Sequence, residues 1–306
     1  GMLKAREDAE VSVEPPKRAR RFVLVGDHYQ LPPLVTDEEA AKLGMGVSLF
    51  RRLSAAHPRA VVRLRQQYRM SAGIMAVSNE LVYGGQLVCV SRAVAEAKLE
   101  LPRAPPPMSQ PDGGPAGHDW LCEALRPEAS VLFLDTDAVP GIETRTEGAR
   151  GAVHNPTEAR LVLQLATALV GAGLPPSEVA VISPYNAQLK LIAQGLPCYM
   201  PARDAEAVET LTIDKCQGRD FEVVLLTMVR SNAAAEIGSL LSDWRRLNVS
   251  FTRAKKKMLL VGSVTTLRAS PPLACLVDLA EQRGWCLKLP PDAHLSSQPP
   301  AHAPPP

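Results

Sequence analysis

The sequence lacks several features on which common classes of protein depend. Its six cysteines include no C-x-x-C pair, which argues against a zinc or iron–sulfur site within the chain. It has no run of about 18 apolar residues, and no apolar signal region follows the Gly1-Met2 start. These absences predict a soluble protein of a reducing intracellular compartment, with no bound metal and no membrane partner.

Aromatic residues and net charge are also low. Aromatic side chains make up 4% of the 306 residues, and 34 basic residues against 32 acidic ones leave a net charge of +2. Any basic groove for a nucleic acid must therefore be local. The 28 prolines cluster in residues 101–115 and from residue 290 onward, which predicts irregular segments in both places.

Buried apolar runs alternate with helical patterns along most of the chain. This alternation predicts an α/β fold with a parallel sheet. The predicted strands are residues 22–25, 61–64, 131–135, 179–182, 222–229, 258–261 and 285–289. The predicted helices are residues 38–42, a segment around 47–53, and residues 71–81, 155–170, 183–193, 243–255 and 272–283.

Four polar strings stand out against this pattern. They are Gly26-Asp27-His28-Tyr29-Gln30-Leu31-Pro32-Pro33, Gln67-Tyr68-Arg69-Met70, residues 209–220, and the residues 243–255 that begin Asp-Trp-Arg-Arg-Leu-Asn. In a helix over 243–255, Arg246 and Arg253 lie seven residues apart and share one side. Guanidinium groups bind phosphate oxygens well, so this side is a candidate polyphosphate site. The spacing alone indicates an ordinary basic helix on the protein surface equally well.

These strings resemble motifs III, IV, V and VI of the superfamily-1 helicases, in the branch that contains the nonsense-mediated-decay helicase. Within that branch they are most similar to the eukaryotic helicase/nucleases of DNA replication. The resemblance covers roughly residues 21–90 and 128–290 and implies RecA-like lobes: a partial first lobe and an essentially complete second one.

The resemblance also assigns roles to single residues. It implies that Gln30 senses the γ-phosphate of ATP and that Arg69 and Arg253 contact phosphate, with Arg253 as the arginine finger. It implies nucleotide contacts by Asp27, Gly218, Asp220 and Arg246, with Asp220 on the ribose. Nucleic-acid contacts are implied for Ser183, Tyr185, Gln188, Thr210 and Thr212.

The chain also departs from the helicase pattern. It contains no Gly-Lys pair, hence no P-loop, and no Walker B strand. We therefore divide it into a leader unrelated to the family (1–20), the C-terminal part of the first lobe (21–90), a Pro/Gly-rich insertion or linker (91–127), the second lobe (128–290) and a Pro-rich tail (291–306). By itself it is predicted neither to hydrolyse ATP nor to unwind DNA.

The expected parent protein is a 5′-to-3′ DNA helicase that couples ATP hydrolysis with Mg²⁺ to movement along single-stranded DNA. The family's nuclease domain, with its iron–sulfur cluster, would lie outside this chain. The resemblance implies replication and repair proteins as partners and the nucleus as location, with the mitochondrion as a second compartment. Two alternatives stay open: a fragment of an RNA helicase of the nonsense-decay branch, and a non-catalytic isoform that binds nucleic acid or a partner.

Overall fold

The computed structural model describes residues 22–103, 120–146 and 151–295, so the predicted leader and most of the Pro-rich tail lie outside the described residues. The chain divides into two compact units. The smaller holds the residues up to His28 and Pro33–Ala60, and the larger holds Tyr29–Pro32 and the residues from Val61 onward. Across the described ranges, no helix combines the length and the apolar character that a membrane span needs.

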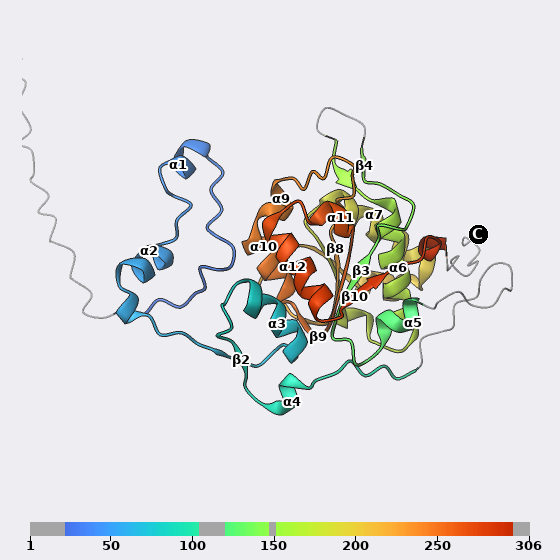
Figure 1. Cartoon of the computed structure of the whole chain (residues 1–306), viewed down its shortest axis with the longest axis horizontal. Helices are drawn as coiled ribbons and strands as arrows, with labels where there is room; N and C mark the ends of the chain where they lie inside the picture. The colour runs from blue at the N-terminus through green and yellow to red at the C-terminus, as the bar shows by residue number, and fades with distance from the viewer. Residues whose placement is uncertain (1–21, 104–119, 147–150, 296–306) are drawn as a thin grey trace, which may run out of the picture. The chain divides into compact units, whose positions relative to one another are not determined.

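A six-stranded parallel sheet forms the centre of the larger unit (Figure 1). In spatial order its strands are β10 (Cys286–Lys288), β3 (Val131–Asp135), β9 (Ala254–Gly262), β8 (Phe221–Thr227), β6 (Val179–Ser183) and β7 (Glu209–Thr212). The inner strands are apolar on both faces, because helices cover each side. The predicted α/β fold with a parallel sheet is thus confirmed.

Alternate residues of each strand enter different cores. In β3, Leu132 and Leu134 pack with α5, α6 and α7, whereas Val131 and Phe133 pack with α3, α10 and α12. The helices on the first side are α5 (Trp120–Leu125), α6 (Pro156–Gly171), α7 (Asn186–Tyr199) and α8 (Ala202–Ala207). Those on the second are α3 (Ala72–Leu81), α9 (Ser239–Ser242), α10 (Trp244–Phe251), α11 (Val264–Leu267) and α12 (Pro271–Gln282).

Local signals place several of these helices. Asn155 caps α6 by accepting a hydrogen bond from the amide of Glu158, and Pro156 occupies the first turn, as the sequence predicts. Two small ladders complete the unit: β1 (Gln66–Gln67) with β2 (Val88–Cys89), and β4 (Thr144–Arg145) with β5 (Val153–His154). Shorter elements are α4 (Arg92–Ala95), η2 (Pro176–Glu178) and η3 (Ala293–Leu295).

The smaller unit contains α1 (Glu38–Lys42), α2 (Leu49–Ala56) and η1 (Pro58–Ala60). Asp37 caps α1 through Ala40, in agreement with the sequence. The predicted strand at residues 22–25 is wrong: these residues form no strand, and Val23 and Val25 are almost fully exposed. No strand among the described residues pairs with them, so their apolar run finds no sheet to join. α2 is a helix as predicted, and none of its residues is buried.

Three further expectations need correction. Residues 61–64 form no strand, and 62–64 are exposed, since the ladder begins only at Gln66. The predicted helix 243–255 ends at Phe251, because the long strand β9 already begins at Ala254. The segment 91–127 is not uniformly irregular: Leu99 and helix α5 are buried in the core.

Helix α5 is attached to the sheet by a buried lysine. Lys257 of β9 is fully buried, and its ammonium group donates to the carbonyl oxygens of Ala124, Arg126 and Ala129. These carbonyls lie at the end of α5 and just beyond it, where helix carbonyl groups lack partners of their own. Burial lowers the pKa of Lys257 to about 8.

Candidate functional site

Arg253 is a buried arginine just beyond the end of α10. Its side chain is 3% exposed, and it donates to the carbonyl oxygens of Val249 and Arg219 and to the hydroxyl of Thr252, at 2.9 to 3.0 Å. Among the residues that the structure describes, no carboxylate pairs with it. Burial and the neighbouring charge of Arg69 lower its pKa. A buried cation without an acid partner is a site at which an anion gains strong stabilisation.

Arg69 provides the second cation of this site. Its Nη1 donates to the carbonyl oxygen of Thr252 at 2.9 Å, and its Nε donates to Asp220 at 3.1 Å. The backbone before it is fixed by Gln67, whose side-chain oxygen accepts from the amides of Arg69 and Met70. The next residue, Ser71, donates from its amide to the carbonyl oxygen of Lys255 in β9. The backbone of Arg69 is therefore fixed locally by Gln67 and attached to the central sheet through Ser71.

Asp220 lies between two cations. One carboxylate oxygen accepts from Arg69, and the other lies 3.8 Å from the ammonium group of Lys255. Asp220 follows the turn of Gly218, whose φ of +81° is a conformation that favours glycine. The turn connects β7 to β8, so it lies at the amino-terminal end of β8, where Phe221 donates from its amide to the carbonyl oxygen of Arg253. Gly218, Asp220, Arg69 and Arg253 thus lie together.

Arg246 is held in a different pair. It lies within α10, and its Nη1 donates to Asp214 at 2.9 Å, while its Nε lies 3.8 Å from Asp243. Because α10 ends at Phe251, Arg246 and Arg253 do not share one helical face, contrary to what the predicted long helix required. Whether Arg246 contacts a nucleotide stays a prediction.

Gln30 lies in a short segment that contacts α10. The preceding residue, Tyr29, accepts a hydrogen bond at its carbonyl oxygen from Asn248, and its ring packs against Tyr83 and Trp244. Asn248 is fully buried and also donates to the hydroxyl of Tyr83. The Gln30 backbone is thereby fixed beside the helix that precedes Arg253. Asp27 belongs to the smaller unit, and its role stays a prediction.

The residues with predicted nucleic-acid contacts differ in exposure. Thr210 and Thr212 are half-buried on the edge strand β7. Ser183 and Gln188 are fully buried: Ser183 donates to the carbonyl oxygen of Thr227, and Gln188 donates to Asn155 and Thr227. These two side chains position the loop between β6 and α7. Their contact with nucleic acid stays a prediction.

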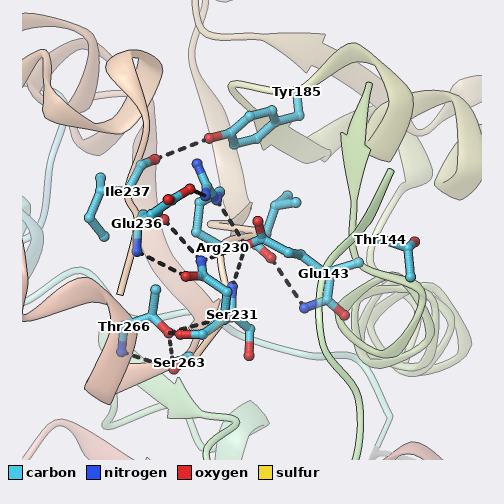
Figure 2. A network of polar contacts seen from close by, with 12 residues as sticks. Glu143, Thr144, Tyr185, Arg230, Ser231, Glu236, Ile237, Ser263 and Thr266 are labelled. Carbon is cyan, nitrogen blue, oxygen red and sulfur yellow. Dashed lines mark hydrogen bonds and ion pairs between the residues drawn. The ribbon is translucent and has the colours of Figure 1, made fainter. Parts of the chain in front are cut away.

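Tyr185 borders a second polar network, at the carboxyl ends of β6 and β8 (Figure 2). Its hydroxyl donates to the carbonyl oxygen of Ile237, and the Arg230 guanidinium lies beside it. Arg230 is 4% exposed and pairs with Glu143 at 2.8 Å. Glu143 also accepts from the amide of Ser231 and the side chain of Asn232, so it joins the β4 segment to the loop after β8.

Two carboxylates near these strand ends have pKa values that are shifted in opposite directions. Burial works against the charge of Glu143, yet hydrogen bonds from Arg230, Asn232 and Ser231 keep its pKa below the usual value. Glu158 is fully buried, and burial raises its pKa to about 7, although Thr227 and Val229 donate to it at 2.6 and 2.8 Å. Val229 itself has a φ of +71°, a strained value for a β-branched residue.

A family profile described as "AAA domain" matches residues 45–265. The chain belongs to the AAA domain family.

Relatives of this AAA domain agree with the motifs. It is 46% identical over 281 residues to the DNA replication ATP-dependent helicase/nuclease DNA2 of Mus musculus, and 40% identical over 279 residues to dna2 of Schizosaccharomyces pombe. These alignments cover 91% of this chain but 26% and 19% of the two relatives. The chain therefore spans about a fifth to a quarter of their length, and the resemblance to a C-terminal helicase segment is confirmed.

A solved structure was also found: the C-terminal domain of a possible DNA helicase from Lactobacillus plantarum WCFS1. It shares 14% identity with the AAA domain described here, with a TM-score of 0.36, and the match covers 72% of this chain and 98% of that one.

Sequence reasoning missed several residues that build the site of this AAA domain. Gln67 fixes the backbone of Arg69, Asn248 fixes that of Tyr29, and Lys255 shares Asp220 with Arg69. Gln67 and Asn248 lie within the motifs recognised in the sequence, but residue spacing does not predict that their side-chain amides bind backbone groups. The ion pair of Glu143 and Arg230 joins residues 87 positions apart, and no local signal announces it.

Proposed function

We propose that this chain supplies the phosphate-sensing part of an ATP-dependent DNA helicase. The observation that carries the proposal is the pairing of Arg253, buried without an acid partner, with Arg69 beside it. Two fixed guanidinium groups stabilise the charge that develops on a transferred phosphoryl group without reorganising during the reaction. In this role Arg253 is the finger, Arg69 is the second phosphate ligand, and Gln30 orients the attacking water.

The nucleotide in this proposal is ATP with Mg²⁺. Gly218 would face its phosphates through the exposed backbone N–H of its turn, and Arg246 and Asp27 would complete the set. The chain has no P-loop, so the P-loop lysine and the P-loop Ser or Thr hydroxyl that binds the metal ion must come from outside it. The chain by itself therefore binds polyphosphate weakly and does not turn ATP over.

The polymer substrate is single-stranded DNA, along which the parent protein moves in the 5′-to-3′ direction. Thr210, Thr212 and Tyr185 would contact its backbone, with Ser183 and Gln188 holding their loop in place. We place the parent protein in the nucleus, with a nuclease and its iron–sulfur cluster elsewhere in the molecule and replication and repair proteins as partners. The names of the relatives support DNA as the substrate, a role in DNA replication and a nuclease activity in the parent protein.

The test is ATP hydrolysis stimulated by single-stranded DNA. It compares the 306-residue chain, an upstream-extended protein that carries a P-loop, and the extended protein with Arg253→Ala. We expect no turnover from the short chain, turnover from the extended protein, and its loss in the variant. Robust hydrolysis by the short chain would overturn the proposal, and stimulation by RNA alone would favour the RNA helicase alternative.

A further inference from the structure

The carboxylate of Asp220 uses a donor that a phosphate would use. Arg69 directs Nη1 to the carbonyl oxygen of Thr252 and Nε to Asp220 at 3.1 Å, so the carboxylate occupies one of the N–H donors of this guanidinium. Carboxylates and phosphates bind guanidinium through the same N–H geometry. Two residues with predicted nucleotide contacts are thus bonded to each other.

Local charge favours an anion other than Asp220. Three cations meet here, Arg69, Arg253 and Lys255, whereas Asp220 is the carboxylate that pairs with the first and lies 3.8 Å from the third. Arg253 pairs with no acid among the described residues. Lys255 also lies 3.6 Å from Glu222, which in turn binds Lys256 at 3.0 Å. Counting all six side chains, four positive charges face two negative ones, so the cluster keeps an excess of positive charge.

Their other contacts, and not their exposure, show which member of the pair can move. The two side chains are similarly exposed, Arg69 at 34% and Asp220 at 40%, but Arg69 is also held by the carbonyl oxygen of Thr252, whereas Asp220 follows the Gly218 turn. An exposed aspartate is released from an ion pair at little free-energy cost, since such pairs contribute little to stability. Its rotation would leave Arg69 and Lys255 facing the same space as Arg253.

We infer that Asp220 takes the place of a phosphate oxygen on Arg69 and competes with a polyphosphate for that position. The inference rests on the proposed phosphate-sensing function. It gives Asp220 a role different from the ribose contact implied by the family resemblance. A ribose ligand needs carboxylate oxygens directed at hydroxyl groups, whereas both Asp220 oxygens face cations.

The experiment titrates the 306-residue chain with tripolyphosphate, which has the charge of a nucleotide tail and no ribose, and in parallel with ATP. Binding is measured by calorimetry for the wild type, Asp220→Asn, Arg69→Gln and the double variant. The matched control is Asp278→Asn, which removes the same charge from another exposed pair, with Arg268 at 2.5 Å. Circular dichroism and melting temperature verify that each variant is folded.

We expect Asp220→Asn to tighten tripolyphosphate binding by about two- to fivefold. This factor corresponds to the loss of one partly exposed ion pair that competes with the ligand. Asp278→Asn should leave the affinity unchanged. The gain should disappear in the double variant, because the competition is for Arg69.

Other outcomes separate this inference from the proposed function. If the wild type and every variant fail to bind tripolyphosphate, the phosphate site itself is refuted. If the wild type binds but Asp220→Asn binds no better than Asp278→Asn, the site stands and the competition is refuted. Weaker ATP binding by Asp220→Asn with unchanged tripolyphosphate binding would make Asp220 a ribose ligand and also refute the competition.

Discussion

Arg69 donates a hydrogen bond to the carbonyl oxygen of Thr252, the residue immediately before Arg253. Two arginines that stand 184 positions apart in the sequence are thereby held next to each other through one peptide unit. Like charges repel, and the charge of Arg69 indeed lowers the pKa of Arg253. The fold maintains this arrangement through fixed backbone acceptors, which prepares the pair for an anion.

The first prediction concerns the charge of Arg253. Arg253→Gln removes the cation but keeps amide donors, and all partners of Arg253 are neutral oxygens. We expect the melting temperature to change little, because loss of a buried, unpaired charge offsets the lost hydrogen bonds. Tripolyphosphate affinity should fall about tenfold or more, as for loss of a charge-assisted bond. Calorimetry measures both; unchanged affinity, or a loss equal to that in Arg268→Gln, would contradict the assignment.

The second prediction concerns pH and Glu158. Its pKa is about 7 in the folded protein and near 4.5 when unfolded, so the folded chain holds a proton that the unfolded chain releases between these values. The stability that this proton contributes is complete below pH 4.5 and is lost as pH rises through 7. The shift corresponds to about 3 kcal/mol.

Glu158→Gln tests this linkage. Urea unfolding at pH 5, 6, 7 and 8 should show the wild type losing stability relative to the glutamine variant as the pH rises. The exposed Glu206→Gln serves as control and should run parallel to the wild type. Parallel curves for Glu158→Gln and the wild type would mean that Glu158 is ionised throughout.

The third prediction concerns the ion pair of Glu143 and Arg230. Glu143→Gln keeps an acceptor but leaves a 4%-exposed arginine with only the exposed Glu236, 3.9 Å away, as counter-charge. Breaking a buried ion pair destabilises proteins by about 3 to 5 kcal/mol. We expect a loss near the lower end of this range in urea unfolding. The exposed pair of Arg92 and Glu96 is the control, and Glu96→Gln should have no measurable effect. Removing both charges, as Glu143→Gln with Arg230→Met, should restore part of the stability.

The fourth prediction concerns Asn248 as the anchor of the Gln30 segment. Asn248→Ala removes hydrogen bonds to the Tyr29 carbonyl and the Tyr83 hydroxyl. Amide hydrogen exchange of residues 29–31 should accelerate, and stability should fall by about 1 to 2 kcal/mol. Gln164→Ala, which removes a hydrogen bond from the buried amide of α6 to the carbonyl oxygen of His294, should leave the exchange of residues 29–31 unchanged. Equal exchange in the two variants would show that Asn248 does not hold this segment.

The sequence predicts the elements whose signals are local. The Asn155-Pro156 start of α6, the cap of α1 at Asp37 and the apolar runs of β3, β6 and β8 all lie where residue patterns place them. Each of these signals acts within a few residues, through a cap, a fixed φ or a continuous buried run. Five of the six strands of the central sheet were therefore predicted, but the edge strand β7 was not, because its residues belong to the polar string 209–220.

Errors arose where the outcome depends on distant partners. Val23 and Val25 have the pattern of a buried strand, but a strand forms only beside another strand, and none among the described residues pairs with them. The helix containing Arg246 stops at Phe251 because β9 competes for the residues from Ala254 onward. The burial of Arg253 follows from that stop, so the candidate site was predicted in composition but not in geometry.

Because Arg253 stands directly before β9, its backbone differs from that of the other site residues in how easily it opens. β9 lies inside the sheet between β3 and β8, so the backbone that carries Arg253 should be among the last parts of the fold to open. Asp220, by contrast, lies in the exposed turn between β7 and β8. Adjustment to a ligand should therefore come from Asp220, while Arg253 keeps its position. Distance changes on binding should be large for Asp220 and small for Arg253.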